Sequence, residues 1–234
     1  MIRIAIIRFP GTNCDRDTLH VRKNILKINT ELVWHTDNNI DKYDVAILPG
    51  GFSYGDNLRA GIIAAHSPAL KIIKDMANKG KPILGICNGF QILVESGLLP
   101  GSLLYNSSLK FVCKWINVKV NNCKTSFTSD CKKSSILRMP IAHAEGRYFI
   151  DNKGLKELER NNQIIFTYVN EQGIKNEESN PNGSLENIAG ISNIEGNVVG
   201  LMPHPERSSE KILSPYNNDD GIKIIQSVVN NLKG

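Results

Sequence analysis

Short apolar runs alternate with helical stretches through the first hundred residues, and this alternation limits the possible folds more than any other feature. Runs such as DVAIL and PILGIC are almost wholly apolar, as strands buried on both faces of a sheet are. Helices placed between such strands produce βαβ units with parallel pairing. The sequence therefore predicts an α/β fold with a mostly parallel sheet. Strands are expected at 2–9, 31–35, 44–50 and 81–87, and helices near 16–28, near 58–78 and from Asn88.

The second half of the chain has a different pattern, with runs rich in β-forming residues in which apolar and polar residues alternate. KFVCKWINVKV at 110–120 alternates, so strands and hairpins are expected within 100–150. Further strands are expected at 163–170, 187–193 and 197–204, joined by tight turns that include Asn182-Gly183. A last helix is expected near 217–232. No linker or repeat divides the chain, so we expect one domain over 1–234 with additional antiparallel strands.

Composition excludes several classes of function. The 28 basic and 23 acidic residues are scattered, with no basic run of the kind that binds nucleic acid. The five cysteines are an odd number without a Cys-x-x-Cys pair, which favours a reduced, cytoplasmic protein. The first apolar run contains Arg3 and Arg8 and is too short for a signal sequence or a membrane span.

Cys87 is the leading candidate for a nucleophile. In KPILGICNGFQILVESG it stands between a predicted strand and a predicted helix, with Gly85 and Gly89 two residues away on either side. The spacing is that of the nucleophile elbow, where a sharp turn lifts the side chain above the sheet and leaves no room for a neighbouring Cβ. Free N–H groups at the helix start favour a thiolate. The alternative is a buried cysteine that only fills space.

His204 and Glu206 are the candidate base and its orienting carboxylate. They lie in VVGLMPHPER, directly after an apolar run, with His204 between two prolines. Prolines favour an extended backbone, in which residues two apart project to one side. A carboxylate beside an imidazole orients it and stabilises its protonated form, as in a catalytic triad. The alternative is a proline-rich turn with a solvated histidine.

The loop after DVAIL supplies candidate oxyanion donors. It opens with Gly50-Gly51, and glycine pairs at this edge of a sheet let backbone N–H groups approach a ligand. We assign one donor to the N–H of Gly51 and the other to the N–H of Asn88, after the nucleophile. An ordinary turn would also use these glycines.

Metal and nucleotide motifs are absent from the sequence. It contains no His-Glu-x-x-His, no zinc-type cysteine pairs, no acidic calcium loop and no Walker loop. We therefore expect no metal site and no ATP site in this chain.

Taken together, these segments resemble the class I glutamine amidotransferases, whose triad is a cysteine in Gly-x-Cys-x-Gly followed much later by His-x-Glu. The resemblance covers nearly the whole chain and is closest to the branch that serves a synthase of purine biosynthesis. It implies a flavodoxin-like, doubly wound sheet and a triad of Cys87, His204 and Glu206. The segments that carry it are FPGTNCDRD, LPGGFSYGDNLRAG, GICNGFQIL, AHAEGRY, NPNGS, IAGI and MPHPER.

The resemblance further implies binding residues and partners. Gln91, together with the backbone around Gly51 and His143, would hold the glutamine substrate. Ammonia would pass to a separate large synthetase subunit that carries ATP and magnesium, with a small subunit bridging the two. Two alternatives stay open: a cysteine peptidase or other hydrolase on the same scaffold, and a scaffolding subunit without catalysis.

Overall fold

The structure, a computed structural model, describes residues 2–232. It is built around one large sheet, and a short two-stranded sheet lies beside it. The strands are β1 (Arg3–Arg8), β2 (Asn29–Trp34), β3 (Val45–Leu48), β4 (Ile83–Ile86), β5 (Ser102–Leu104), β6 (Val112–Val120), β7 (Ile136–His143), β8 (Arg147–Phe149), β9 (Ile164–Val169), β10 (Ile188–Ser192) and β11 (Val198–Leu201).

The large sheet has a parallel half and an antiparallel half. Its strand order is β2-β1-β3-β4-β11-β10-β9-β6-β7, and neighbouring strands from β2 to β11 run parallel. The five parallel strands have the order of flavodoxin-like folds, in which the chain crosses from one side of β1 to the other. The predicted α/β fold and the four predicted strands of the first hundred residues are confirmed.

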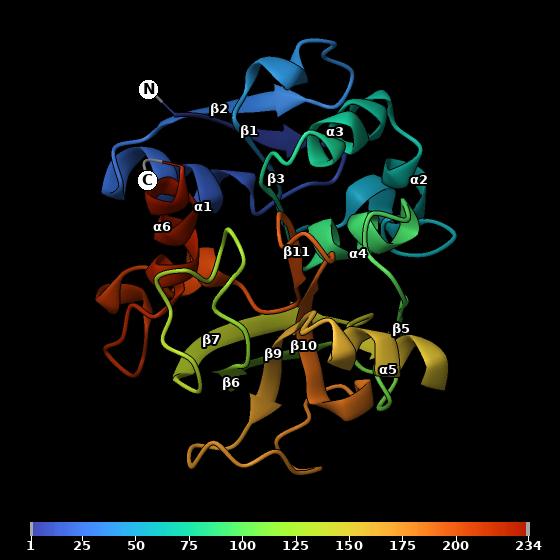
Figure 1. The fold of residues 1–234 in the computed structure, drawn as a ribbon, viewed down its shortest axis with the longest axis vertical. Coiled ribbons are helices and arrows are strands. Elements are labelled where there is room, and N and C mark those ends of the chain that lie inside the picture. Colours follow the sequence, from blue (N-terminus) through green and yellow to red (C-terminus); the bar gives the residue numbers. More distant parts are fainter. Residues whose placement is uncertain (1, 233–234) are drawn as a thin grey trace.

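Helices cover both faces of the parallel half. They are α1 (Asp15–Leu19), which continues as a π-helical segment over His20–Ile25, α2 (Ile62–Ala65), α3 (Pro68–Asn78), α4 (Asn88–Glu95) and α6 (Gly221–Asn231). Helix α5 (Asn152–Arg160) lies beside the antiparallel half instead. Figure 1 shows α2, α3 and α4 on one side of the parallel strands and α1 and α6 on the other. The helix predicted near 58–78 is divided in two, since Pro68 starts a new helix.

The antiparallel half differs from the sequence expectation in two places. Helix α5 was not predicted, and its first residue follows Asp151, whose side chain accepts a hydrogen bond from the Gly154 N–H. Strands β9 and β10 pair, but the segment between them is long and contains a 3₁₀ turn, so Asn182-Gly183 is not a hairpin turn. Asn182 is instead 1% exposed and makes hydrogen bonds inside the protein.

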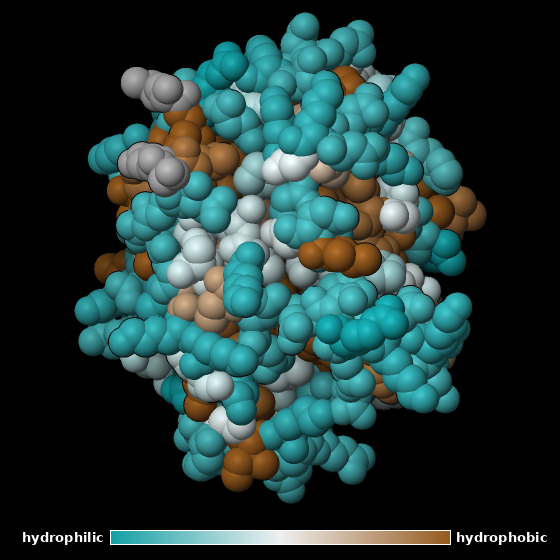
Figure 2. Space-filling view, viewed as in Figure 1, coloured by the Kyte–Doolittle hydropathy of each residue, from teal (hydrophilic) through white to brown (hydrophobic). Residues whose placement is uncertain are grey.

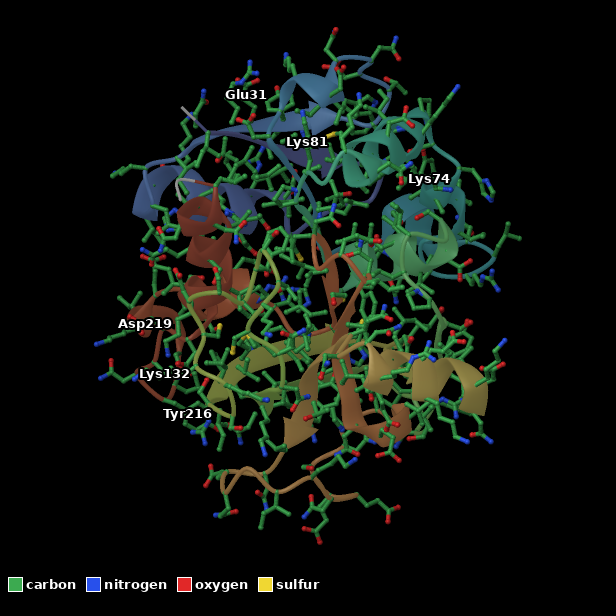
Figure 3. The ribbon with its side chains drawn as sticks, viewed as in Figure 1. Glu31, Lys74, Lys81, Lys132, Tyr216 and Asp219 are labelled. Carbon is green, nitrogen blue, oxygen red and sulfur yellow. The ribbon has the colours of Figure 1, made fainter. Side chains whose placement is uncertain are left out.

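Hydrophilic residues cover most of the face shown in Figure 2, where apolar residues form separate patches. Charged side chains such as Lys74 on α3 and Lys132 before β7 point outward from the two halves (Figure 3). Among residues 2–232, none of the helices combines the length and apolar character that crossing a bilayer requires.

The carboxyl ends of four parallel strands meet at one edge of the sheet. The segments after β1, β3, β4 and β11 carry Cys14, Gly50, Cys87 and His204 respectively. The register of the sheet aligns the ends of β3, β4 and β11, because Leu48 pairs with Gly85 and Leu201 pairs with Ile86. Ligand sites of open α/β sheets lie at this edge.

Helix α4 packs closely on β3, and two glycines allow it to do so. A Cβ on Gly89 would lie 1.9 Å from the carbonyl oxygen of Leu48, and one on Gly85 would lie 2.6 Å from the carbonyl oxygen of Gly89. The steric reason for the Gly-x-Cys-x-Gly spacing is therefore confirmed. The close packing places the residue between strand and helix directly above the sheet.

Replacing Gly89 with alanine should destabilise the fold. The new methyl group overlaps backbone that cannot rotate away, so we expect a loss of ~2 kcal/mol or more in the free energy of unfolding, measured by urea titration. Gly80→Asn is the matched control, because nothing lies within 4 Å of its Cβ position and asparagine tolerates its φ of +77°. Equal stability of the two variants would contradict the packing argument.

Candidate active site

Cys87 occupies a strained turn at the end of β4. Its backbone has φ 51° and ψ −106°, a conformation that non-glycine residues adopt at a cost of ~1–3 kcal/mol. The side chain is 5% exposed, and its Sγ lies 3.7 Å from the carbonyl oxygen of Ala142 on β7. Helix α4 begins at Asn88, whose N–H has no partner within the helix. The turn has the geometry of a nucleophile elbow.

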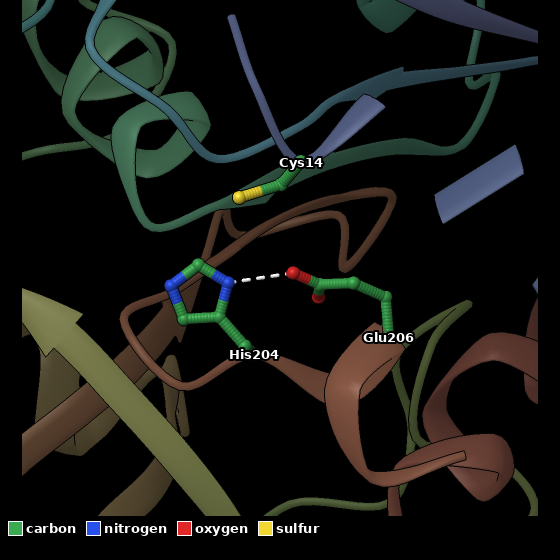
Figure 4. Close-up of side chains that lie close together, drawn as sticks. All are labelled: Cys14, His204 and Glu206. Carbon is green, nitrogen blue, oxygen red and sulfur yellow. Dashed lines mark hydrogen bonds and ion pairs between the residues drawn. The ribbon is translucent and has the colours of Figure 1, made fainter. Parts of the chain in front are cut away.

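His204 and Glu206 form a buried pair at the end of β11. The imidazole Nδ1 lies 2.6 Å from Glu206 Oε1, and the two residues are 2% and 1% exposed (Figure 4). The predicted pair is therefore present, but the predicted extended backbone is wrong beyond His204. Pro205 begins a 3₁₀ turn over Pro205–Ser208, since proline suits the first helical position, and this turn brings the carboxylate back to the imidazole.

The surroundings of His204 favour its protonated form. Burial alone would lower the pKa of the imidazole, but the Glu206 carboxylate raises it, and so do the thiols of Cys87 and Cys14. The net result is a pKa of His204 well above its ordinary value. The His204 backbone N–H donates to the carbonyl oxygen of Pro140, 2.9 Å away, which attaches this segment to β7. An imidazolium fixed beside a cysteine can donate a proton to a leaving group.

Gly51 brings backbone close to Cys87 from the loop after β3. Its φ is +144°, and a Cβ there would lie 2.7 Å from the backbone nitrogen of Asn13, so the position requires glycine. A single β-bridge joins Gly51 to Thr12 in the loop after β1. Gly51 and Cys87 line the same two cavities. The two residues predicted as oxyanion donors, Gly51 and Asn88, therefore lie on different segments, Gly51 in the loop that shares both cavities with Cys87 and Asn88 directly after Cys87.

The larger of these cavities, about 270 Å³, is the one that His204 lines. Cys87, His204 and Arg207 line it, and so do two further cysteines, Cys14 and Cys113. Arg207 donates a hydrogen bond to Cys14 Sγ at 3.1 Å. Neither Cys14 nor Arg207 was a candidate from the sequence, because no local pattern links either of them to Cys87.

The smaller cavity, about 30 Å³, lies on the other side of Cys87 and is lined by polar and acidic groups. The Asn88 side-chain amide donates to Gln91 Oε1 at 2.9 Å and to Asp56 Oδ1 at 3.4 Å. Gln91 in turn donates to the carbonyl oxygen of Glu145 at 2.6 Å. Gln91, which the family resemblance implies in glutamine binding, is thus held in place at this cavity.

Two carboxylates approach each other in this smaller cavity. The pKa of the Asp56 carboxyl is raised to about 6, mainly by burial and also by the charge of Glu145. Within residues 2–232, neither Asp56 nor Glu145 forms an ion pair with a basic side chain. A cationic group in the cavity would relieve their repulsion.

His143 lies at this cavity, but its ring makes contacts with the protein. It is 3% exposed, with Nδ1 3.1 Å from Asn106 Oδ1 and Nε2 3.5 Å from Asn182 Nδ2. The pKa of His143 is lowered to about 3, mainly by burial and also by the charge on His204, so the ring is neutral. Asn106 and Asn182 were not found from the sequence, because no local pattern links them to His143.

The flavodoxin-like sheet, the cysteine elbow and the buried histidine-carboxylate pair define a protein of the glutamine amidotransferase class. The sequence matches the family described as the CobB/CobQ-like glutamine amidotransferase domain over residues 1–230. The chain belongs to this family. It is a glutamine amidotransferase, as its resemblance to that class predicts.

Individual proteins of known name that are similar to this chain point to one branch of the family. The phosphoribosylformylglycinamidine synthase subunit PurQ of Methanosarcina acetivorans is 52% identical over 227 residues, which cover 97% of each chain. The protein of the same name from Aquifex aeolicus is 51% identical over 97% of this chain and 99% of its own. A chain in the solved structure of PurLQS from Thermotoga maritima superposes with a TM-score of 0.85 at 44% identity, covering 99% of both chains.

Removing the Asp56 charge should stabilise the protein at neutral and higher pH. The folded-state pKa of about 6 lies above the ordinary value of 3.8, so the charged carboxylate costs stability above pH ~6, and the cost disappears below pH ~4. We expect Asp56→Asn to raise Tm at about pH 8 and to match the unsubstituted protein at about pH 3.

The exposed Asp75 on α3 provides the control. Thermal unfolding of Asp75→Asn should match that of the unsubstituted protein at both pH values. If Asp56→Asn raised Tm as much at about pH 3 as at about pH 8, the stabilisation could not be due to loss of the Asp56 charge.

Proposed function

We propose that this chain is the glutaminase subunit of phosphoribosylformylglycinamidine synthase, and that it releases ammonia from glutamine for a synthetase subunit. The observation that carries this proposal is that the Cys87 elbow shares a cavity with His204, whose Nδ1 is paired with the buried Glu206. The full-length similarity to proteins named as this subunit supports the substrate and the pathway of purine biosynthesis.

In the proposed reaction, the Cys87 thiolate attacks the side-chain amide carbon of glutamine. The N–H groups of Gly51 and Asn88 bind the developing oxyanion, each contributing ~3 kcal/mol of transition-state stabilisation. The imidazolium of His204 gives its Nε2 proton to the departing ammonia. Neutral His204 then takes a proton from water, which hydrolyses the glutamyl thioester and releases glutamate. Glu206 keeps the imidazole oriented and stabilises its charged form.

The smaller cavity suits the α-amino end of the substrate. We assign Gln91, the backbone of Gly51 and the segment at His143 to glutamine binding, as the family resemblance implies. The unpaired carboxylates of Asp56 and Glu145 add negative charge, which attracts the α-ammonium group of glutamine. The substrate would thus reach Cys87 with its charged end in the acidic cavity.

The second half of the reaction is assigned to other subunits. The Thermotoga maritima structure carries the name PurLQS, which denotes an assembly of subunits. We propose that this chain, as one domain over 1–234, works in a complex with a large synthetase subunit and a small bridging subunit. ATP and magnesium would act on the synthetase, because converting formylglycinamide ribonucleotide to formylglycinamidine ribonucleotide requires activation of an amide oxygen.

Replacing Cys87 with alanine should abolish glutamine-dependent synthesis by the reconstituted complex. Synthesis from added ammonia should be unchanged, because the substitution removes the nucleophile and leaves the synthetase intact. Measuring product formation with each nitrogen source checks this. Cys131→Ala, at a buried cysteine outside the site, is the control and should retain both activities.

Other outcomes would separate the alternatives. Full glutamine-dependent synthesis by Cys87→Ala would exclude Cys87 as nucleophile. Peptide cleavage without glutaminase activity would favour a cysteine peptidase. Failure of an electrophilic glutamine analogue to label Cys87 in the complex would favour a scaffolding subunit.

The KM for glutamine should rise as pH falls below ~6. Protonation of Asp56, whose pKa is about 6, removes the charge that attracts the α-ammonium group. Asp56→Asn should raise this KM ~10-fold at about pH 8 and should remove the rise on acidification, since a charged hydrogen bond contributes ~1.5–3 kcal/mol. Glutaramate, which lacks the amino group, is the control substrate and should bind both proteins equally. If Asp56→Asn preferred glutamine to glutaramate as strongly as the unsubstituted protein does, this role of Asp56 would be disproved.

A further inference from the structure

Two cysteines and the proposed base surround one point in the larger cavity. A Cβ placed on Gly50 would lie 2.8 Å from His204 Cε1, 3.1 Å from Cys14 Sγ and 3.5 Å from Cys87 Cβ. Glycine at position 50 therefore lets Cys14 and Cys87 approach the same imidazole from two different segments. Cys14 is 2% exposed, and the proposed reaction gives it no task.

Cys14 and His204 belong to a group of side chains that lie close enough together to share a cation. Cys14 Sγ, an imidazole nitrogen of His204 and a carboxylate oxygen of Glu206 all lie within 4.8 Å of one another (Figure 4). Ligand atoms around a tetrahedral zinc ion are about 3.5 Å apart, given bonds of ~2.0–2.3 Å. Modest side-chain rotation would close the remaining difference.

His204 already has the arrangement of a metal-binding histidine. Its Nδ1 is held by Glu206, and its Nε2 is buried without a hydrogen-bond partner within the described chain. Metal-bound histidines commonly engage a carboxylate through one nitrogen, which fixes the tautomer and aims the other nitrogen at the metal. The buried, unpartnered Nε2 is an observation independent of the two thiols.

We propose that Cys14, Cys87 and His204 form an inhibitory site for a soft divalent cation of the Zn²⁺ class. The ligands are the two sulfurs and Nε2, a set that favours zinc and cadmium over magnesium. Water completes the tetrahedron. Binding releases two protons to solvent, one from Cys14 and one from the Cys87-His204 pair, and no redox change occurs.

The functional consequence rests on the proposed function. One bound ion occupies the nucleophile and the base together, so glutamine hydrolysis stops while ammonia-dependent synthesis continues. Glu206 keeps its orienting role toward the imidazole. Arg207 donates a hydrogen bond to Cys14 Sγ, which holds that sulfur at the cavity.

Cys113 provides a matched control. It lines the same cavity but is exposed, on β6 opposite Ala142. It is outside the proposed ligand set, so Cys113→Ser should leave metal binding unchanged. Cys14→Ser should weaken it, because a hydroxyl is a poor ligand for a soft ion.

The first test measures inhibition of the complex by Zn²⁺, with each rate normalised to that variant's rate without zinc. Zinc should inhibit glutamine-dependent synthesis and spare ammonia-dependent synthesis, and a chelator should reverse the inhibition. Cys14→Ser should raise the inhibition constant ~10-fold or more, and Cys113→Ser should not change it. Equal inhibition of the unsubstituted and Cys14→Ser proteins would overturn the proposal.

A second measurement needs neither activity nor a folded variant. Cd²⁺ bound to the unsubstituted chain should show a thiolate-to-metal charge-transfer absorption. Its intensity, calibrated with small cadmium thiolate complexes, should correspond to two thiolates per bound ion. Intensity for one thiolate or none would refute the site even if zinc inhibits. Two-thiolate binding, together with no glutamine hydrolysis by the reconstituted complex, would uphold the site and reject the proposed function instead.

Discussion

The close packing of α4 against β3 sets the position of everything else in the site. Because Gly89 lies directly against the carbonyl group of Leu48, the turn between β4 and α4 is sharp, and Cys87 takes a strained backbone conformation above the sheet. The same turn leaves the first N–H of α4 free beside the sulfur. A looser helix would move both the sulfur and this donor, and the segments after β1, β3 and β11 would no longer converge on them.

Electrostatics divide the surroundings of Cys87 into two halves. On one side, a carboxylate and two thiols hold a buried imidazole in its charged form against the cost of burial. On the other side, Asp56 and Glu145 repel each other, and His143 stays neutral between two asparagines. Such an arrangement costs stability, as strained backbone and unpaired charge do in general, and it is tolerated because the surrounding sheet is well packed. Under the proposed function, the acidic half would attract the α-ammonium group of the substrate, and the imidazolium in the other half would protonate the departing ammonia.

Much of the fold and the centre of the site follow from local sequence. The alternation of apolar and helical segments specified the parallel half, because burial on both faces leaves a continuous apolar run. The spacing of Gly85, Cys87 and Gly89 specified the elbow through sterics alone. His204 and Glu206 were paired correctly although the expected extended backbone was wrong. Two residues apart, they stay close in either conformation, so that error did not matter.

What the sequence by itself determined is therefore short-range: which segments are strands, which turn carries the nucleophile candidate and which carboxylate accompanies the histidine. Only the tertiary structure decided that Cys14 and Arg207, 193 positions apart, touch beside Cys87. It also decided that Asn106 and Asn182 hold His143 and that Asp56 faces Glu145. These contacts depend on the order of strands in the sheet and on the long path between β9 and β10. Local hydrophobic periodicity and turn sterics act over a few residues, and they do not encode which distant segments become neighbours when the sheet closes.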